Sequence, residues 1–155
     1  LMGTLSKALG SEGGYVAASQ LIIDYLRNSA RSFIFSTSQT PATLAAANAA
    51  LKLLQADRSH VARLHENTRI FCKALQAHGL PVQSDTAIVP IPIGDEARAT
   101  AVAETLFQEG IFINAIRYPT VTKGNARLRA AIMATHTPEE LQSAARTIAD
   151  VLRNQ

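Results

Sequence analysis

Lys7 is the residue of this sequence whose surroundings most strongly suggest chemistry. It follows a β-like run that contains Thr4 and precedes a glycine-rich stretch, residues 10–14. Its neighbours are small, apolar or hydroxylic, so a solubilising charge explains it poorly. A lysine removed from water is more readily a neutral amine, and such an amine attacks carbonyl groups to form a Schiff base. From the residues alone, an ordinary turn lysine remains the favoured interpretation, and a Schiff-base lysine is the alternative.

Hydroxyl and guanidinium side chains supply the other candidate groups. Ser36 and Thr37 are adjacent hydroxyls after an aromatic run, and such pairs commonly end a strand or cap a helix. Arg127 and Arg129 lie two residues apart, so on a strand both point to one face. Taken alone, they indicate surface ion pairs, and Arg117 indicates an ordinary loop residue.

No group of residues predicts a metal site. His60 and His65 are five residues apart, which is the wrong helical phase for joint ligation, and the other two histidines are isolated. A structural role near a helix start is expected for His136. The single cysteine, Cys72, cannot form an internal disulfide, and it falls on the apolar side of a predicted helix. These features favour a core position for Cys72 and a reducing compartment, the cytoplasm.

The composition predicts a packed globular chain. Of 155 residues, 47% are hydrophobic and 17% are charged, so long disordered tracts are not expected. Fifteen Lys and Arg against twelve Asp and Glu give a net charge of +3 without a basic block, so nucleic acid is not an expected partner. No apolar run reaches the roughly 18 residues of a membrane span. The chain begins on apolar, ordered-looking residues, and we interpret it as part of a longer protein.

Hydrophobic periodicity and turn residues predict alternating strands and helices. Pro41 after Thr40 is typical of a capped helix start, and the helical spacing that follows continues to a stop at Gly79. This stretch is one long helix, or two with a break near residues 57–59. Strands are expected at residues 1–5, 15–18, 87–93, 111–116 and 127–133, with a β-prone run at 33–35; further helices are expected at 21–26, 96–109 and from 138 onward. The two prolines within 87–93 predict an edge strand or a bulge.

Four segments in order resemble the α-oxoamine synthases, the class II pyridoxal-phosphate-dependent acyltransferases. They are MGTLSKALGSEGGYV at residues 2–16, FIFSTSQTPA at 33–42, AIRYPTVTKGNARLR at 115–129 and ATHT at 134–137. Together they cover almost the whole chain, which makes them more specific than any one alone. Many members of the family have Pro-Pro where this chain has Thr40-Pro41 and Tyr118-Pro119.

The resemblance implies an α/β fold, namely the C-terminal part of a type I pyridoxal-phosphate transferase. Residues 1–57 would be the end of the large cofactor-binding domain, including the Schiff-base lysine segment. Residues 58–155 would form a small C-terminal α+β domain with an antiparallel sheet. The aspartate and histidine that complete the family's cofactor pocket would lie upstream, so this chain alone is expected to be inactive.

The resemblance also implies a role for each candidate residue. Lys7 would bind pyridoxal 5′-phosphate as a Schiff base and act as acid and base at the substrate α-carbon. Thr4 would contact the cofactor phosphate of its own subunit. Ser36 and Thr37 would contact that of the neighbouring subunit, which implies a homodimer with shared active sites. Two arginines, Arg129 and Arg117, would bind the carboxylate of the amino-acid substrate.

The reaction that the resemblance implies is the decarboxylative condensation of an amino acid with an acyl-CoA. Residues 115–117, Ala-Ile-Arg, resemble the biotin-biosynthesis branch, whose substrates are L-alanine and pimeloyl-CoA, whereas residues 118–121, Tyr-Pro-Thr-Val, resemble the aminolevulinate synthases. The alternatives are a sibling such as 2-amino-3-ketobutyrate CoA ligase or serine palmitoyltransferase, and a generic type I aminotransferase. A further alternative is a catalytically silent docking module.

Overall fold

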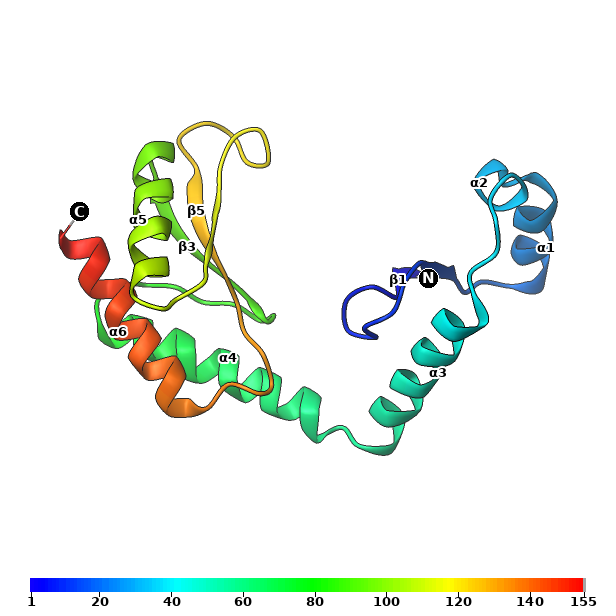
Figure 1. Ribbon diagram of the computed structural model, residues 1–155, viewed down its shortest axis with the longest axis horizontal. Coiled ribbons are helices and arrows are strands. Elements are labelled where there is room, and N and C mark those ends of the chain that lie inside the picture. The colour runs from blue at the N-terminus through cyan, green and yellow to red at the C-terminus, as the bar shows by residue number, and fades with distance from the viewer. Residues whose placement is uncertain (155) are drawn as a thin grey trace. The chain divides into compact units, whose positions relative to one another are not determined.

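The computed structural model describes residues 1–154, which divide into two compact units (Figure 1). The first unit spans Leu1–Arg58, and the second begins at Ser59. The assignment of the first to a large cofactor-binding domain stays a prediction. None of the helices within residues 1–154 has the length and hydrophobicity of a membrane span.

A short β-hairpin opens the first unit. Strand β1 (Met2–Thr4) pairs antiparallel with β2 (Gly14–Val16), and Gly3 lies opposite Tyr15. A Cβ atom on Gly3 would lie 2.7 Å from the Tyr15 ring, so this ring packs over Gly3 and a larger residue there would displace it. Both predicted strands are confirmed, although each is shorter than expected.

Three helices follow the hairpin: α1 (Gln20–Ser29), α2 (Arg31–Ile34) and α3 (Pro41–Ala56). The start of α3 is the predicted one, because the Thr40 hydroxyl accepts a hydrogen bond from the Thr43 amide at 3.3 Å and Pro41 follows the cap. Pro41 lacks an N–H group that the first helical turn would leave unpaired in any case.

The β-prone run at residues 33–35 is wrong as a strand prediction. The Phe33 amide donates to the carbonyl of Ala30 at 2.9 Å, and the Phe35 amide donates to the carbonyl of Arg31 at 3.0 Å. These bonds form α2, a single helical turn, and the Arg31 guanidinium lies 5.7 Å from the centre of the Phe35 ring. The helical turn forms because no neighbouring strand is available to pair with the run, and local bonds then satisfy its backbone.

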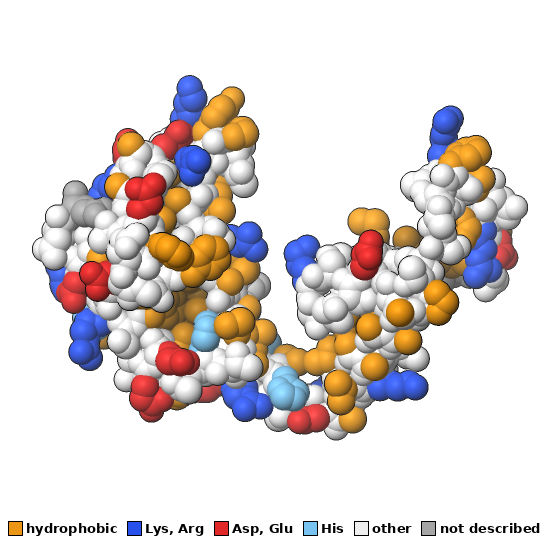
Figure 2. All heavy atoms as spheres, viewed as in Figure 1, with side chains coloured by type: hydrophobic (Ala, Val, Ile, Leu, Met, Phe, Trp, Pro, Cys, Tyr) orange, Lys and Arg blue, Asp and Glu red, His pale blue; other side chains and the backbone are white. Residues whose placement is uncertain are grey.

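The first unit buries little hydrophobic surface. Within residues 1–58, Leu5 and Ala47 are its buried hydrophobic residues, whereas large apolar side chains on its helices are exposed (Figure 2). The most exposed of these side chains belong to Leu21, Tyr25, Phe33, Phe35 and Leu53. Apolar patches of this extent are typical of surfaces that pack against other protein.

The long helical stretch consists of two helices, so the alternative with a break is confirmed. Helix α3 ends at Ala56, and α4 (Ser59–Ala77) begins three residues later. Asp57 interrupts the helical backbone with an extended conformation, at φ −136° and ψ 110°.

The second unit is a three-stranded antiparallel sheet with three helices. Its strands are β3 (Ile88–Gly94), β4 (Asn114–Ile116) and β5 (Ala126–Ala131), in the spatial order β3–β5–β4. Helix α4 precedes the sheet, α5 (Glu96–Gln108) connects β3 to β4, and α6 (Pro138–Asn154) ends the described chain. The predicted small α+β unit is confirmed.

The prolines of β3 lie where the sheet tolerates them. β3 is an edge strand, and its register with β5 shifts between Pro92 and Gly94, so the predicted edge position and bulge are both present. β4 is shorter than the expected strand at residues 111–116. The Ile111 amide instead donates to the carbonyl of Leu106 at 2.8 Å, because these residues close the end of α5.

One face of the sheet packs on the helices and forms the core. Along β5, Ala126, Leu128 and Ala130 are buried, whereas Arg127 and Arg129 alternate with them toward the opposite face. Each helix and strand β3 add fully buried side chains to this core, namely Leu75, Val89, Ile91, Val102, Leu106 and Ile148. The second unit therefore has the continuous hydrophobic core that the first lacks.

Asn67 on α4 fixes the chain between β5 and α6. It is 3% exposed, and its Nδ2 donates to the carbonyls of Met133 at 2.9 Å and His136 at 2.8 Å. The Met133 amide in turn donates to Nδ1 of His136 at 3.2 Å, so the predicted structural role of His136 is confirmed. Thr137 and Glu140 then form a reciprocal capping box at the start of α6.

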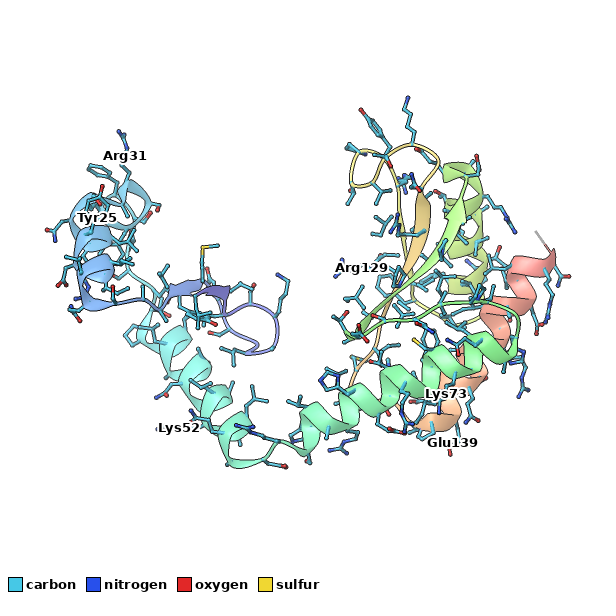
Figure 3. All side chains as sticks on the ribbon, turned by 180° about the vertical axis from the view of Figure 1, so that it is seen from behind. Tyr25, Arg31, Lys52, Lys73, Arg129 and Glu139 are labelled. Atoms are coloured by element: carbon cyan, nitrogen blue, oxygen red, sulfur yellow. The ribbon has the colours of Figure 1, made fainter. Side chains whose placement is uncertain are left out.

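Replacing Asn67 by leucine should lower the free energy of unfolding by about 2–4 kcal/mol, because two partly buried carbonyls lose their donor. Urea denaturation of the complete protein measures the change. Lys73→Leu is the matched control, because Lys73 is exposed on the same helix (Figure 3) and its replacement should cost no more than about 0.5 kcal/mol. Equal effects of the two substitutions would contradict the bridging role of Asn67.

Candidate functional site

Lys7 lies in the loop between β1 and β2. Leu5 anchors this loop: it is buried, its amide donates to the carbonyl of Gly13 at 2.9 Å, and its carbonyl accepts from the amide of Ser11 at 3.0 Å. The Lys7 carbonyl accepts from the amide of Gly10 at 3.0 Å, and Gly10 has a φ of +55°. The backbone around Lys7 is therefore held on both sides, while its side chain is exposed.

The expected removal of Lys7 from water is not supplied by its own unit, residues 1–58. The side chain is exposed and makes no hydrogen bond or ion pair with the described residues. Small neighbours are typical of a buried lysine, but in the first unit they leave the amine uncovered. Any shielding of this amine has to come from groups outside the first unit.

Thr4 organises the hydroxyl groups beside Lys7. Its Oγ1 donates to the carbonyl of Gly13 at 3.2 Å, and it accepts from the amide of Ser6 at 3.2 Å. It also lies 2.7 Å from the Ser6 hydroxyl, and either hydroxyl can be the donor between them. An anion that binds the Thr4 hydroxyl would therefore have to replace one of these contacts.

The segment with Ser36 and Thr37 is tethered to the lysine loop. Nε2 of Gln39 donates to the carbonyl of Glu12 at 3.0 Å, and the Ser11 hydroxyl donates to the carbonyl of Thr43 at 2.7 Å. Ser36–Thr37 follow α2, are exposed, and make no hydrogen bonds among residues 1–154. They neither end a strand nor cap a helix, so both hydroxyls are available to an external group.

Gly13 makes the close approach of the two segments possible. Its φ is +95°, and a Cβ atom there would lie 1.4 Å from Nε2 of Gln39. We expect Gly13→Ala to lower the free energy of unfolding by about 2–3 kcal/mol, because the backbone is strained and Gln39 must give up its hydrogen bond.

Gly10→Ala is the control, because Gly10 also has a positive φ but its Cβ would meet no atom within 4 Å. It should cost about 1 kcal/mol in urea denaturation of the complete protein. A loss at Gly13 no larger than the loss at Gly10 would show that the contact with Gln39 is unimportant.

Arg129 lies on the face of the sheet away from the core (Figure 3). It is exposed, and in the sheet register it pairs with Asn114 on β4 and Pro90 on β3. Arg127 lies on the same face. The interpretation of both arginines as ion-pair formers is wrong for residues 1–154, because neither has a carboxylate partner there. The segment 110–138 contains no Asp or Glu that could neutralise them.

Arg117 follows β4 and opens the loop to β5. Its carbonyl accepts from the amides of Thr120 at 3.0 Å and Val121 at 3.4 Å, and its side chain is exposed. In the same loop, the Lys123 ammonium lies 5.3 Å from the centre of the Tyr118 ring. The second unit thus presents exposed cations that have no carboxylate partner among the described residues. Such cations suit an anionic ligand.

A groove of about 830 Å³, not predicted from the sequence, lies between the end of β5, the segment 109–114 and α6. Phe112 lies at this groove, is 79% exposed, and contacts Phe107 edge-on at 6.4 Å between ring centres. Glu139, labelled in Figure 3, is at its rim. In the sequence, the only sign of this groove is Phe112, an aromatic residue just beyond the end of a predicted helix. The strand predicted at residues 111–116 also accounts for an aromatic residue at this position.

No group of three or more His, Cys, Asp or Glu side chains within residues 1–154 is placed to hold a metal ion. Cys72 is buried in the core, as expected, and burial raises the pKa of its thiol. A buried thiol of this kind is a poor nucleophile. The reactive groups that remain are an exposed amine with hydroxyls in the first unit and exposed guanidinium groups in the second.

Comparison with known proteins gives a consistent set of relatives. The family model described as aminotransferase class I and II matches residues 1–148. The chain is 48% identical over 148 residues to an 8-amino-7-oxononanoate synthase of Bacillus velezensis, a match that covers 95% of this chain and 38% of the relative. It is 45% identical over 155 residues to the enzyme of that name from Trichlorobacter lovleyi, covering 98% and 40%. The chain spans about two fifths of the length of these relatives.

Solved structures give the same fold. A structure of serine palmitoyltransferase with pyridoxal phosphate is 29% identical, with a TM-score of 0.91, covering 99% of this chain and 39% of that one. The 8-amino-7-oxononanoate synthase of Francisella tularensis is also 29% identical, with a TM-score of 0.85, covering 99% and 45%. The predicted α/β type I fold is confirmed, and pyridoxal phosphate is the cofactor of this family.

The resemblance to the α-oxoamine synthases is therefore confirmed by relatives that match nearly the whole chain. A lysine between hydroxyl groups and an arginine on a sheet face are the features that a cofactor with an aldehyde and a phosphate, and a substrate with a carboxylate, would require. The chain belongs to the family of class I and II aminotransferases, and among its relatives are 8-amino-7-oxononanoate synthases.

Proposed function

We propose that the complete enzyme condenses an amino acid, L-alanine, with an acyl-CoA, pimeloyl-CoA, in biotin biosynthesis in the cytoplasm. The products are an aminoketone, CoA and CO2. In the balance of the reaction, a new C–C bond joins the amino acid's α-carbon to the acyl carbonyl carbon. The C–S bond of the thioester and the bond from the α-carbon to the carboxylate both break. The observation that carries the proposal is the identity of 44–48% with 8-amino-7-oxononanoate synthases over more than nine tenths of the chain.

The residues of the lysine loop fit pyridoxal phosphate. Lys7 offers an accessible primary amine for the aldehyde, and the Thr4 hydroxyl offers a hydrogen for the phosphate once it leaves the Gly13 carbonyl. Pyridoxal phosphate, when bound, supplies an electron sink for the α-carbon. The amine of Lys7 would hold the cofactor covalently and move the proton at the substrate α-carbon.

The homodimer is part of the proposal. Ser36 and Thr37 are exposed hydroxyls without hydrogen bonds to residues 1–154, and they would bind the phosphate in the neighbouring subunit. The exposed apolar side chains of the first unit support a large surface that packs against other protein. Part of this surface would pack on upstream residues and part on the second subunit.

Arg129 would bind and orient the carboxylate of the amino acid. A planar guanidinium holds a carboxylate through two parallel hydrogen bonds, which fixes the direction of the neighbouring α-carbon. Arg117 would assist from the loop after β4. The absence of Asp and Glu from the segment 110–138 supports this role, because no internal carboxylate competes with the substrate.

The sibling enzymes are the second candidates, and the similarity of the fold favours serine palmitoyltransferase among them. Serine palmitoyltransferase structures match the fold with TM-scores up to 0.91, yet at 26–29% identity they are far below the 8-amino-7-oxononanoate synthases in sequence. A generic aminotransferase would transfer the amino group to a keto acid and release no CoA. A catalytically silent docking module would neither transfer an amino group nor release CoA.

A substrate matrix with the complete enzyme tests the proposal. Alanine, glycine and serine are each combined with pimeloyl-, acetyl-, succinyl- and palmitoyl-CoA, and released CoA thiol and CO2 are measured. We expect the highest kcat/KM with alanine and pimeloyl-CoA, and one CO2 for each CoA. A preference for serine with palmitoyl-CoA, or amino transfer without CoA release, would overturn the proposal. The 155-residue chain alone should be inactive because it lacks part of the cofactor pocket, and a borohydride-reducible Schiff base at its Lys7 would contradict the view that the pocket is incomplete.

A further inference from the structure

Two arginines share one face of the sheet with a row of apolar residues. Arg127 and Arg129 both point away from the core along β5. Their Cα atoms are about 6.5–7 Å apart, as expected for residues two apart on a strand. In the register, Arg127 pairs with Pro92 on β3 and Ile116 on β4, both of which are apolar. The face thus presents two cations on a largely apolar surface.

Arg127 differs from Arg129 in how its side chain is held. Its Nε donates to the carbonyl of Asn125 at 3.1 Å, and its side chain is half-buried. The two terminal amino groups of its guanidinium have no hydrogen-bond partner or carboxylate within residues 1–154. Arg127 is therefore a positioned cation that lacks a counter-charge. Its terminal amino groups are available to donate to an external anion.

The proposed reaction brings a second carboxylate to this enzyme. The amino acid contributes the carboxylate that Arg129 would bind, and a pimeloyl thioester carries a free carboxylate at the far end of its methylene chain. When the α-carbon joins the acyl carbonyl carbon, the two carboxylates lie at opposite ends of one chain. Pro92 and Ile116 lie directly opposite Arg127, and Pro90 and Asn114 lie opposite Arg129, so the two guanidinium groups have apolar neighbours that a methylene chain could contact.

We propose that Arg127 binds the free carboxylate of a dicarboxylic acyl donor and selects it over monocarboxylic acyl thioesters. The inference rests on the proposed function and adds to it the residue that sets acyl specificity. Methylene groups of the donor would lie over Pro92 and Ile116, and Arg127 would hold the carboxylate through its two free amino groups.

The test compares pimeloyl-CoA with heptanoyl-CoA, which has the same chain length but no free carboxylate. In the complete enzyme, Arg127→Gln should lower the preference for pimeloyl-CoA, as the ratio of the two kcat/KM values, by about 10- to 100-fold. The KM for alanine should stay within about twofold. Arg127→Lys keeps the charge and should retain part of the preference. Arg146→Gln, on the exposed side of α6, is the control and should change neither ratio nor KM.

Equilibrium binding provides a readout without turnover. Calorimetric titration should show free pimelate binding to the wild-type enzyme more tightly than heptanoate, and Arg127→Gln should remove this difference. A thermal melt of each variant identifies any loss of folding, in which case Arg127→Lys alone decides the outcome. Equal losses for both donors would overturn the proposal, since they would point to CoA phosphates or to a structural role. No preference for pimelate in the wild type would overturn it as well.

The experiments distinguish a failure of this proposal from a failure of the proposed function. If the enzyme turns over pimeloyl-CoA but Arg127→Gln keeps the preference, Arg127 is excluded and the function stands. If the wild-type enzyme prefers a monocarboxylic donor in the substrate matrix, the proposed function fails, and the pimelate titration still decides whether Arg127 binds carboxylates.

Discussion

Lys7→Ala is expected to lower kcat/KM of the complete enzyme for the condensation by at least about 10³-fold. The substitution removes the only group of the lysine loop that can bind the cofactor covalently and move the proton at the substrate α-carbon. The loop itself should persist, because Leu5, Gly10 and Gly13 hold it through backbone hydrogen bonds that do not involve the side chain of Lys7. The loss should therefore appear in activity and not in stability.

Two measurements check this expectation. Turnover is followed by CoA release, and covalent attachment is followed by the visible absorbance of the lysine-bound cofactor and by mass after borohydride reduction. Lys7→Arg keeps the charge without a Schiff-base-forming amine and should be equally inactive. Lys52→Ala, on the exposed surface of α3 (Figure 3), should behave as wild type. Retained turnover and retained covalent attachment in Lys7→Ala would remove the lysine from the mechanism.

Arg129→Ala is expected to raise the KM for alanine and to lower kcat/KM by about 10- to 100-fold. The proposed interaction with the alanine carboxylate is a charge-assisted, bidentate hydrogen bond worth about 1.5–3 kcal/mol. kcat should also fall, because a carboxylate that is held loosely no longer orients the α-carbon. The KM for the acyl-CoA should change little. Steady-state kinetics with each substrate varied in turn measures these effects.

Stability separates a binding role of Arg129 from a structural one. Arg129 is exposed and makes no ion pair within residues 1–154, so Arg129→Ala should change the free energy of unfolding by no more than about 0.5 kcal/mol. Arg129→Lys should recover part of the affinity, because it restores the charge without the fork. A loss of stability with an unchanged KM for alanine would show that Arg129 is structural.

The two units differ in how far contacts within each unit stabilise its structure. The second unit has a core that runs from α4 through the sheet to α6, with seven large side chains less than 2% exposed. The first unit holds its lysine loop mainly by backbone hydrogen bonds and by tethers such as that from Gln39 to Glu12. We therefore expect the lysine segment to depend on the rest of the enzyme for its stability, whereas the sheet with Arg129 is supported locally.

Elements with strong local signals were predictable from the sequence. Thr40 and Thr137 cap helices as expected, Gly110 ends α5 with a φ of +82°, and the prolines of β3 lie at a sheet edge. In each case the residue itself supplies the geometry or the missing hydrogen-bond partner, so few distant contacts are needed. The motifs around Lys7 and Arg129 also identified the family from the sequence, because several specific motifs occur in the order that is typical of it.

Features that depend on distant partners were decided by the tertiary structure alone. The aromatic run at residues 33–35 had strand propensity but no strand beside it, so its backbone formed a helical turn. The exposure of Lys7, the unneutralised pair Arg127 and Arg129 and the groove beside Phe112 depend on which groups lie opposite, and that is set by the packing of elements far apart in the chain. Residue types determine which chemistry is available, while burial and the nearest charges determine which groups are free to perform it.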